Sequence, residues 1–311
     1  MSVKQKPMAP KHIVISDEEH QLPYSKGLMA ASIMATGLAP ARAFHVAECI
    51  EHRLHERGAP TITRAELTEV ARQTLVDEVG ERHAESFVDW QVVNRLDTPL
   101  IILIGGATGV GKSTIATQLA ARIGITRIIP TDAIREVMRS MLRSELLPSL
   151  HTSSFAEPRS RVPPPPESDP VIIGFREQSS AVAVGIRALV RRAVEERTNL
   201  VIEGAHVVPG LLKPNEYSDA ALVPFVVTVD DEELHRSHFM ARARESRRGS
   251  VRYLEYFDNI RTIQHYIKSL AIEHDTPIVA SYNLDATLAQ VIDLVVSAAR
   301  TAADPTLRSN Q

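Results

Sequence analysis

The strongest chemical signal in the sequence is a glycine-rich segment, Gly105-Gly106-Ala107-Thr108-Gly109-Val110-Gly111-Lys112-Ser113-Thr114. From Gly106 it fits the pattern G-x-x-x-x-G-K-[ST] of a phosphate-binding loop. Glycines let successive backbone amides turn toward phosphate oxygens, and the helix that follows adds the partial positive charge of its N-terminus. Lys112 would reach the β- and γ-phosphates, and the Ser113 hydroxyl would bind Mg²⁺. We therefore predict a nucleoside triphosphate site formed by Gly106, Ala107, Thr108, Gly109, Val110, Gly111, Lys112, Ser113 and Thr114.

An acidic residue, Glu203, stands at the end of a later apolar run, Leu200-Val201-Ile202-Glu203-Gly204. This run ends in Glu203, whereas motor or switch GTPases usually end the equivalent strand in Asp. The sequence also lacks the N-K-x-D pattern that reads guanine. We therefore favour ATP over GTP, with Mg²⁺, and count Glu203 among the candidate catalytic residues.

In a kinase, a second site binds the acceptor, the molecule that receives the phosphoryl group. We predict this site at Thr131-Asp132, which follows a short apolar run. Asp132 could accept the proton of an acceptor hydroxyl or hold Mg²⁺. The alternative is a helix N-cap. Arg135, Arg139 and Arg143 are spaced by four, so they share one helix face and could bind an anionic ligand. The alternative there is a solvated basic face paired with nearby glutamates.

A second arginine cluster lies around Gly249 and comprises Arg242, Arg244, Arg247, Arg248 and Arg252. Phosphoryl transfer needs positive charge on the transferred group and exclusion of water, which a mobile lid supplies. We therefore predict a lid here, with Arg244 as a candidate catalytic residue. The alternative is a solvated linker between two helices.

The elements that would position these residues alternate between strand and helix after residue 98. The apolar runs predict strands at 100–104, 127–129, 200–203, 223–229 and 277–280, and the periodic segments predict helices at 112–123, 132–144, 179–197, 232–245, 253–274 and 286–301. Such alternation indicates an α/β fold with a parallel sheet and helices on both faces. The proline run 163–166 predicts a loop.

The first 97 residues have a different pattern, with helical spacing and a short strand expected at 13–15. Thr63 and Glu66 form a capping-box pattern that opens one of the helices. We predict two domains: a small, mainly helical domain at 1–97 and a phosphate-loop kinase domain at 98–311.

Composition narrows the function classes. The formal net charge of −3 argues against a general nucleic-acid coat. No apolar run reaches the roughly 18 residues that span a bilayer, so we expect no membrane partner. Cys49 is the single cysteine, which excludes a disulfide within the chain and suits a reducing cytoplasm.

Five segments, 104–114, 131–139, 150–155, 174–178 and 202–210, together resemble the 2-phosphoglycerate kinase family. The resemblance covers roughly residues 98–285 and continues over the N-terminal part, which looks like an ATP-cone, a small nucleotide-binding module. ATP-cones usually carry a basic pair where this chain reads Ile15-Ser16-Asp17-Glu18. We therefore expect weak or no ATP binding by that module.

The resemblance implies transfer of the ATP γ-phosphate to the 3-hydroxyl of 2-phosphoglycerate, giving 2,3-bisphosphoglycerate. An acceptor with a carboxylate and a phosphate suits arginine, which pairs bidentately with either group. The motif residues that we expect to meet it are Arg135, Arg139, His151, Ser153, Ser154, Arg176, His206 and Lys213. Two alternatives remain open: a kinase for another polyanionic acceptor, such as a phosphorylated polyol or inositol phosphate, and a non-catalytic ATP sensor.

Overall fold

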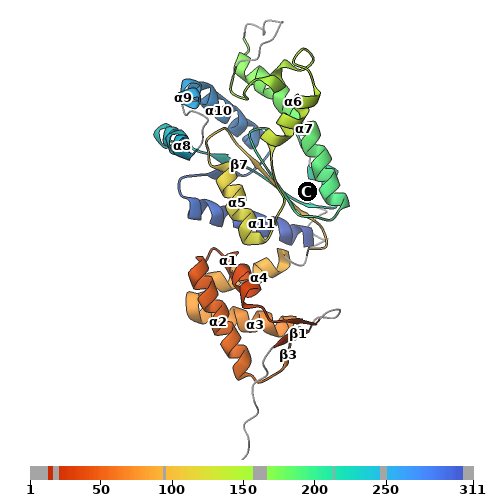
Figure 1. Cartoon of the computed structure of the whole chain (residues 1–311), viewed down its shortest axis with the longest axis vertical. Coiled ribbons are helices and arrows are strands. Elements are labelled where there is room, and N and C mark those ends of the chain that lie inside the picture. The colour runs from red at the N-terminus through yellow and green to blue at the C-terminus, as the bar shows by residue number, and fades with distance from the viewer. Residues whose placement is uncertain are drawn as a thin grey trace, which may run out of the picture. The chain divides into compact units, whose positions relative to one another are not determined.

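The computed structural model describes residues 13–16, 21–93, 96–156, 167–212, 214–245 and 251–303. The predicted proline loop and Lys213 lie outside these residues. The chain divides into two compact units near residue 95, which we describe separately (Figure 1).

In its described residues, the N-terminal unit combines four helices with a three-stranded sheet in the order β2-β1-β3. Its elements are β1 (Val14–Ser16), β2 (Gln21–Pro23), α1 (Lys26–Met34), α2 (Pro40–Glu56), β3 (Thr61–Thr63), α3 (Arg64–Val79) and α4 (Glu81–Val93). The predicted capping box is present, because the Thr63 hydroxyl accepts from the Glu66 amide while the Glu66 carboxylate accepts from the Thr63 amide. Apolar faces of the helices form one core that includes Ile33, Ile50 and Leu75.

The C-terminal unit is built on a five-stranded, all-parallel sheet in the order β5-β6-β4-β7-β8. Its strands are β4 (Leu100–Gly105), β5 (Ile128–Pro130), β6 (Leu200–Glu203), β7 (Ala221–Thr228) and β8 (Ile278–Ala280). The predicted α/β class is thus confirmed. The central strand β4 is buried along its whole length, as expected for a strand covered on both faces.

The helices of this unit are α5 (Lys112–Ile123), α6 (Thr131–Met141), α7 (Pro170–Glu195), α8 (Glu232–Glu245), α9 (Val251–Glu255), α10 (Phe257–Glu273) and α11 (Leu284–Ala303), with short 3-10 turns η1 (Pro148–His151) and η2 (Pro214–Tyr217). The chain moves in opposite directions along the sheet after β4 and after β5. Right-handed crossovers therefore place α5 and α7 on opposite faces (Figure 1). On the α7 face, Val182, Ile186 and Val190 pack against the apolar side chains of β4 and β6.

Three helices differ from the sequence prediction. Helix α6 ends at Met141 rather than at residue 144, because Leu142 is extended, so Arg143 lies beyond the helix and does not share the face of Arg135 and Arg139. Helix α7 begins at Pro170 rather than at residue 179, because the Asp169 side chain accepts a 2.8 Å hydrogen bond from the Val171 amide and Pro170 occupies the first turn. The predicted helix 253–274 is divided at Tyr256 into α9 and α10. The extra turns of α7 carry Gln178 to the candidate site.

One described helix, α11, is long and apolar enough to span a membrane by length and composition alone. One apolar face of the helix is buried, with Leu288, Val291 and Val295 among its residues, and the helix packs against β7 and β8. Burial against the sheet explains the apolar composition of α11 as that of a core helix.

Candidate active site

The glycine-rich loop connects the end of β4 to the first turn of α5, which is the context that a phosphate-binding loop requires. The Lys112 side chain is buried in the loop, and its Nζ donates a 2.7 Å hydrogen bond to the Ala107 carbonyl oxygen. No hydrogen bond among the described residues uses the backbone amides of Gly109 or Val110. These donors are therefore available to an anion.

Ser113 and Glu203 form a pair of oxygen ligands beside this loop. The Ser113 hydroxyl donates a 2.9 Å hydrogen bond to Glu203 Oε1, and Glu203 is the last residue of β6, the strand next to β4. Hydroxyl and carboxylate oxygens are the ligands that Mg²⁺ prefers. The residues present therefore fit a magnesium ion between them.

A cavity of about 740 Å³ opens above the carboxyl end of the sheet, where parallel α/β sheets bind ligands. Thr108 of the glycine-rich loop lines it, and so do residues of α6, η1, the turn after η1 and α9. Its lining is Thr108, Asp132, Ala133, Arg135, Glu136, Arg139, His151, Thr152, Ser153, Ser154, Phe155, Arg252 and Tyr253. The structure thus brings together most of the residues predicted for the acceptor side.

Asp132 lies on the cavity wall in the first turn of α6. Its side chain is 79% exposed, and Oδ1 is 3.6 Å from Nε of Arg135. The N-cap of α6 is Pro130, and no side chain makes a capping hydrogen bond there. The alternative of Asp132 as a helix cap is therefore not seen in the structure.

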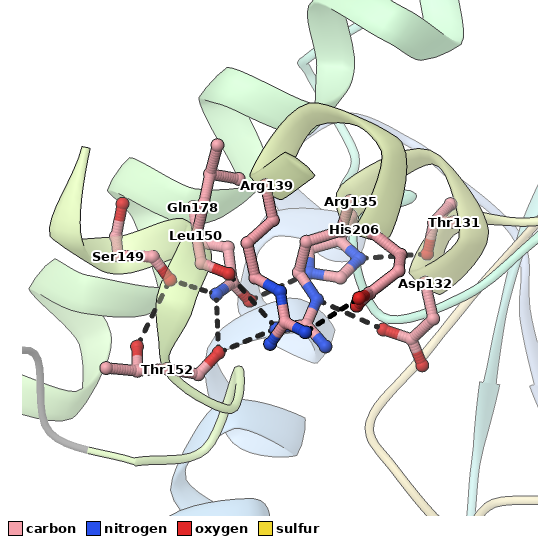
Figure 2. A network of polar contacts seen from close by, with 10 residues as sticks. Thr131, Asp132, Arg135, Arg139, Ser149, Leu150, Thr152, Gln178 and His206 are labelled. Atoms are coloured by element: carbon pink, nitrogen blue, oxygen red, sulfur yellow. Dashed lines mark hydrogen bonds and ion pairs between the residues drawn. The ribbon is translucent and has the colours of Figure 1, made fainter. Parts of the chain in front are cut away.

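The guanidinium group of Arg135 is held by hydrogen bonds to backbone carbonyl oxygens. Its Nη1 donates to the carbonyl oxygens of Thr152 at 2.7 Å and Leu150 at 3.3 Å (Figure 2). Its Nε is buried and makes no hydrogen bond among the described residues. The Asp132 carboxylate is its nearest acidic neighbour, and the positive charge of the guanidinium group at the cavity wall favours an anionic ligand. Arg139, one turn further along α6, pairs with Glu136 at 2.6 Å.

Gln178 of α7 holds the segment 149–152, which also binds Arg135, through hydrogen bonds. Its Nε2 donates to the carbonyl oxygens of Ser149 and, at 3.1 Å, Thr152, so its Oε1 must accept the 2.9 Å hydrogen bond from His206 Nε2. His206 Nδ1 then accepts from the Thr131 hydroxyl at 2.9 Å. Figure 2 shows this chain of contacts running from Thr131 to the loop at 149–152.

His206 is fully buried and is held neutral. Burial lowers the pKa of His206 to about 4, and the positive charges of Arg135 and Lys112 act in the same direction, while Asp132 opposes them. Both ring nitrogens are used by protein groups. We therefore interpret His206 as a residue that positions the acceptor loop, and a direct substrate contact by its ring would require one of these bonds to break.

Some predicted residues are not gathered at the cavity. Arg176 is exposed on α7 and does not line the cavity. The side chain of Arg244 lies outside the described ones, as do Arg247 and Arg248, so the lid and the role of Arg244 stay predictions. Arg252 of that cluster does line the cavity.

Sequence reasoning missed two contacts from α8 to the glycine-rich loop. His235 Nε2 is 2.8 Å from the Thr108 carbonyl oxygen, and His238 Nδ1 is 2.9 Å from that of Gly109. A histidine inside a polar helix carries no motif, so no local signal could have identified either residue.

One other group of metal-ligand side chains, His45, Cys49 and Glu78, lies close together among the described residues. Nη2 of Arg42 is 3.8 Å from the Glu78 carboxylate and competes for it. Burial and the Glu78 charge raise the pKa of the Cys49 thiol, which disfavours the thiolate that binds metals. We assign no ion to this group.

No family model matches the chain. Among curated proteins it is 40% identical over 281 residues to a 2-phosphoglycerate kinase of Methanothermobacter thermautotrophicus, which covers 89% of this chain and 92% of that protein. It is 39% identical to a 2-phosphoglycerate kinase of Thermococcus kodakarensis, over 90% of this chain and 96% of that protein. A third, from Methanopyrus kandleri, is 38% identical over 92% of this chain and 88% of its own length.

Proposed function

The chain belongs to the 2-phosphoglycerate kinase family, and we propose that it transfers the γ-phosphoryl group of ATP to the free hydroxyl of 2-phosphoglycerate. The products are ADP and 2,3-bisphosphoglycerate. One observation carries the proposal: Thr108 of the phosphate-binding loop and Arg135 of the acceptor side line the same cavity. A γ-phosphate held by the loop and an anionic acceptor held by α6 would therefore meet there.

The transfer forms one bond and breaks another. The acceptor hydroxyl oxygen bonds to the γ-phosphorus, and the bond from that phosphorus to the bridging oxygen breaks, leaving its electron pair on ADP. The hydroxyl proton needs an acceptor, and we propose that the exposed carboxylate of Asp132 on the cavity wall takes it. Lys112 neutralises charge on the phosphates during this step.

Two features support a doubly anionic acceptor. Arg135, Arg139 and Arg252 line the same cavity and supply positive charge to it. A guanidinium group pairs with a carboxylate or a phosphate through two parallel hydrogen bonds. The hydroxyls of Ser153 and Ser154 supply neutral donors in the same cavity.

Ser113 and Glu203 are the residues that would hold Mg²⁺. The ion supplies neutralisation of the charge that builds up on the β- and γ-phosphates. We propose Ser113 and Glu203 as the direct ligands of the ion. Asp132 would not bind the ion directly, because its carboxylate lies beside Arg135.

For the N-terminal unit we propose an ATP-cone-like module that has lost strong nucleotide binding. The fold described above, with four helices and a three-stranded sheet, supports a separate small domain. The missing basic pair near Ser16 supports the loss of binding.

Mass spectrometry of the reaction products tests the activity. The full chain is incubated with ATP, Mg²⁺ and one acceptor from a panel containing 2-phosphoglycerate, 3-phosphoglycerate, a phosphorylated polyol and an inositol phosphate. We expect a phosphorylated product with 2-phosphoglycerate and none with the folded Lys112→Ala variant. Product formed only from another acceptor would change the substrate, and ATP turnover unaffected by every acceptor would favour the sensor.

A further inference from the structure

Helix α8 touches the outer side of the phosphate-binding loop at two consecutive peptide groups. His235 donates from Nε2 to the Thr108 carbonyl oxygen at 2.8 Å, and His238 donates from Nδ1 to the Gly109 carbonyl oxygen at 2.9 Å. A carbonyl oxygen only accepts, so each of these ring nitrogens carries a proton. The two contacts join residues that are 127 and 129 positions apart in the sequence.

Peptide planarity gives these contacts a consequence on the other side of the loop. The carbonyl of Thr108 and the amide of Gly109 belong to one planar trans unit and point in opposite directions. The same holds for the carbonyl of Gly109 and the amide of Val110. Holding both carbonyls toward α8 therefore turns both N–H groups away from it, and neither N–H is used by another described residue.

The histidines are themselves held in place. The His235 ring is buried, stacks on Phe239 with a centroid separation of 5.3 Å and meets the edge of Phe257 at 5.4 Å. Burial lowers the pKa of His235 to about 4, so the ring is neutral near pH 7 and keeps one donor nitrogen. Its Nδ1 has no partner among the described residues.

Helix α8 fits closely against the loop at Gly109. This residue has φ of 88°, in the region that favours glycine, and a side chain there would collide with the ring of Phe239. Such close approach leaves the carbonyls of the loop within reach of the helix.

We propose that His235 and His238 are positioning residues that hold the phosphate-binding loop in the conformation in which the amides of Gly109 and Val110 face the phosphates of ATP. This inference rests on the proposed function only for the identity of the nucleotide. The two histidines act on the loop backbone and touch no acceptor group, so their effect falls on nucleotide affinity.

Calorimetric titration of the full-length protein with ATP tests the proposal. His235→Leu and His238→Leu each remove one donor, and we expect each to raise the Kd for ATP by roughly three- to tenfold, as loss of one hydrogen bond does. Glutamine places an amide nitrogen where His235 Nε2 lies, and asparagine does so for His238 Nδ1. His235→Gln and His238→Asn should therefore restore binding to within about twofold of the parent.

His265→Leu, at an exposed position of α10, is the matched control. The melting temperature of each unliganded variant shows that it is folded. If a leucine variant unfolds, the corresponding amide variant still decides, because it keeps the donor. ATP binding within twofold of the parent in both folded leucine variants would overturn the proposal, as would failure of the amide variants to restore it.

Kinetics separate this result from the proposed activity. We expect the KM for ATP to rise in the leucine variants while the KM for 2-phosphoglycerate stays unchanged. If no acceptor is phosphorylated by the parent, the proposed function fails, and the calorimetric comparison still tests the positioning role.

Discussion

The Ser113 hydroxyl donates a 2.9 Å hydrogen bond to Glu203, although the two residues are 90 positions apart. Ser113 lies in the first turn of α5 and Glu203 ends the neighbouring strand β6. The parallel pairing of β4 with β6 brings these two ends to the same edge of the sheet. The Ser113 hydroxyl oxygen and the Glu203 carboxylate oxygen therefore lie side by side where the phosphate-binding loop ends and α5 begins.

Glu203→Gln tests whether this pair holds magnesium. Glutamine keeps an oxygen that can accept from Ser113 but removes the negative charge. We expect kcat to fall by about 10²- to 10³-fold, in the range seen when one electrostatic contact to the transition state is lost. Steady-state assays across a magnesium titration measure it, with the exposed Glu216→Gln as control. An unchanged magnesium requirement would contradict the assignment.

Asp132→Asn separates proton transfer from metal binding. Loss of a general base costs roughly 10²- to 10⁴-fold in kcat, while ATP should bind as before. Because Asp132 makes no capping hydrogen bond in α6, the melting temperature should stay close to that of the parent. Recovery of activity with more Mg²⁺ or with Mn²⁺ would point to the metal instead. A kcat within a few-fold of the parent would exclude both roles.

Arg135→Lys tests recognition of the acceptor. Lysine keeps the positive charge. Its single ammonium group cannot donate to the carbonyls of Leu150 and Thr152 and also form two parallel hydrogen bonds to an anion, as a guanidinium group can. We expect the KM for 2-phosphoglycerate to rise by roughly ten- to a hundredfold with the KM for ATP unchanged. Arg192→Lys, in an exposed pair with Glu196, is the control. Equal effects on both substrates would argue against an acceptor role.

The buried neutral His206 predicts a loss of stability in acid. Its pKa is about 4 in the folded protein and near 6.5 when exposed. Between these two values the unfolded chain binds more protons than the folded one, so the free energy of unfolding falls as the pH is lowered from about 6.5 to 4.

Chemical denaturation at several pH values, compared with His206→Asn, measures this contribution. The comparison is necessary because carboxylates and His235 titrate over part of the same range. The variant should show a shallower loss of stability than the parent. Parallel pH profiles for the two proteins would show that His206 does not titrate as its burial predicts.

A fragment covering residues 1–97 tests the N-terminal module. The unit has its own apolar core, so circular dichroism should show a folded, mainly helical fragment. We expect calorimetry to detect weak ATP binding or none, because the basic pair is missing. Micromolar affinity in the folded fragment would contradict this and indicate an allosteric site.

The sequence was sufficient to predict the position of the glycine-rich loop between β4 and α5 and the class of the fold. The glycine-rich loop is local, so a pattern of eight residues predicts both its shape and its ligand. The order of the strands and the acceptor cavity depend on contacts between distant segments. Gln178 illustrates this dependence: its motif was visible, but its bonds to the loop at 149–152 and to His206 exist only in the folded chain.

The missed start of α7 had a local signal. Asp169 followed by Pro170 is a common helix opening, but the nearby proline run made the whole stretch read as a loop. The three-residue strands β2 and β3 had no such signal, because a run of that length shows no measurable periodicity.

The glycine at the end of β6 bears on which parts of the site can be re-engineered. Gly204 has φ of 152°, and any side chain there would collide with the Thr131 hydroxyl that bonds His206. Directed evolution should therefore find almost no accepted substitutions at this position. Ser153 and Ser154, on the turn after η1 that lines the cavity, are only partly buried. Libraries at those two positions are where a changed acceptor preference should emerge with the fold intact.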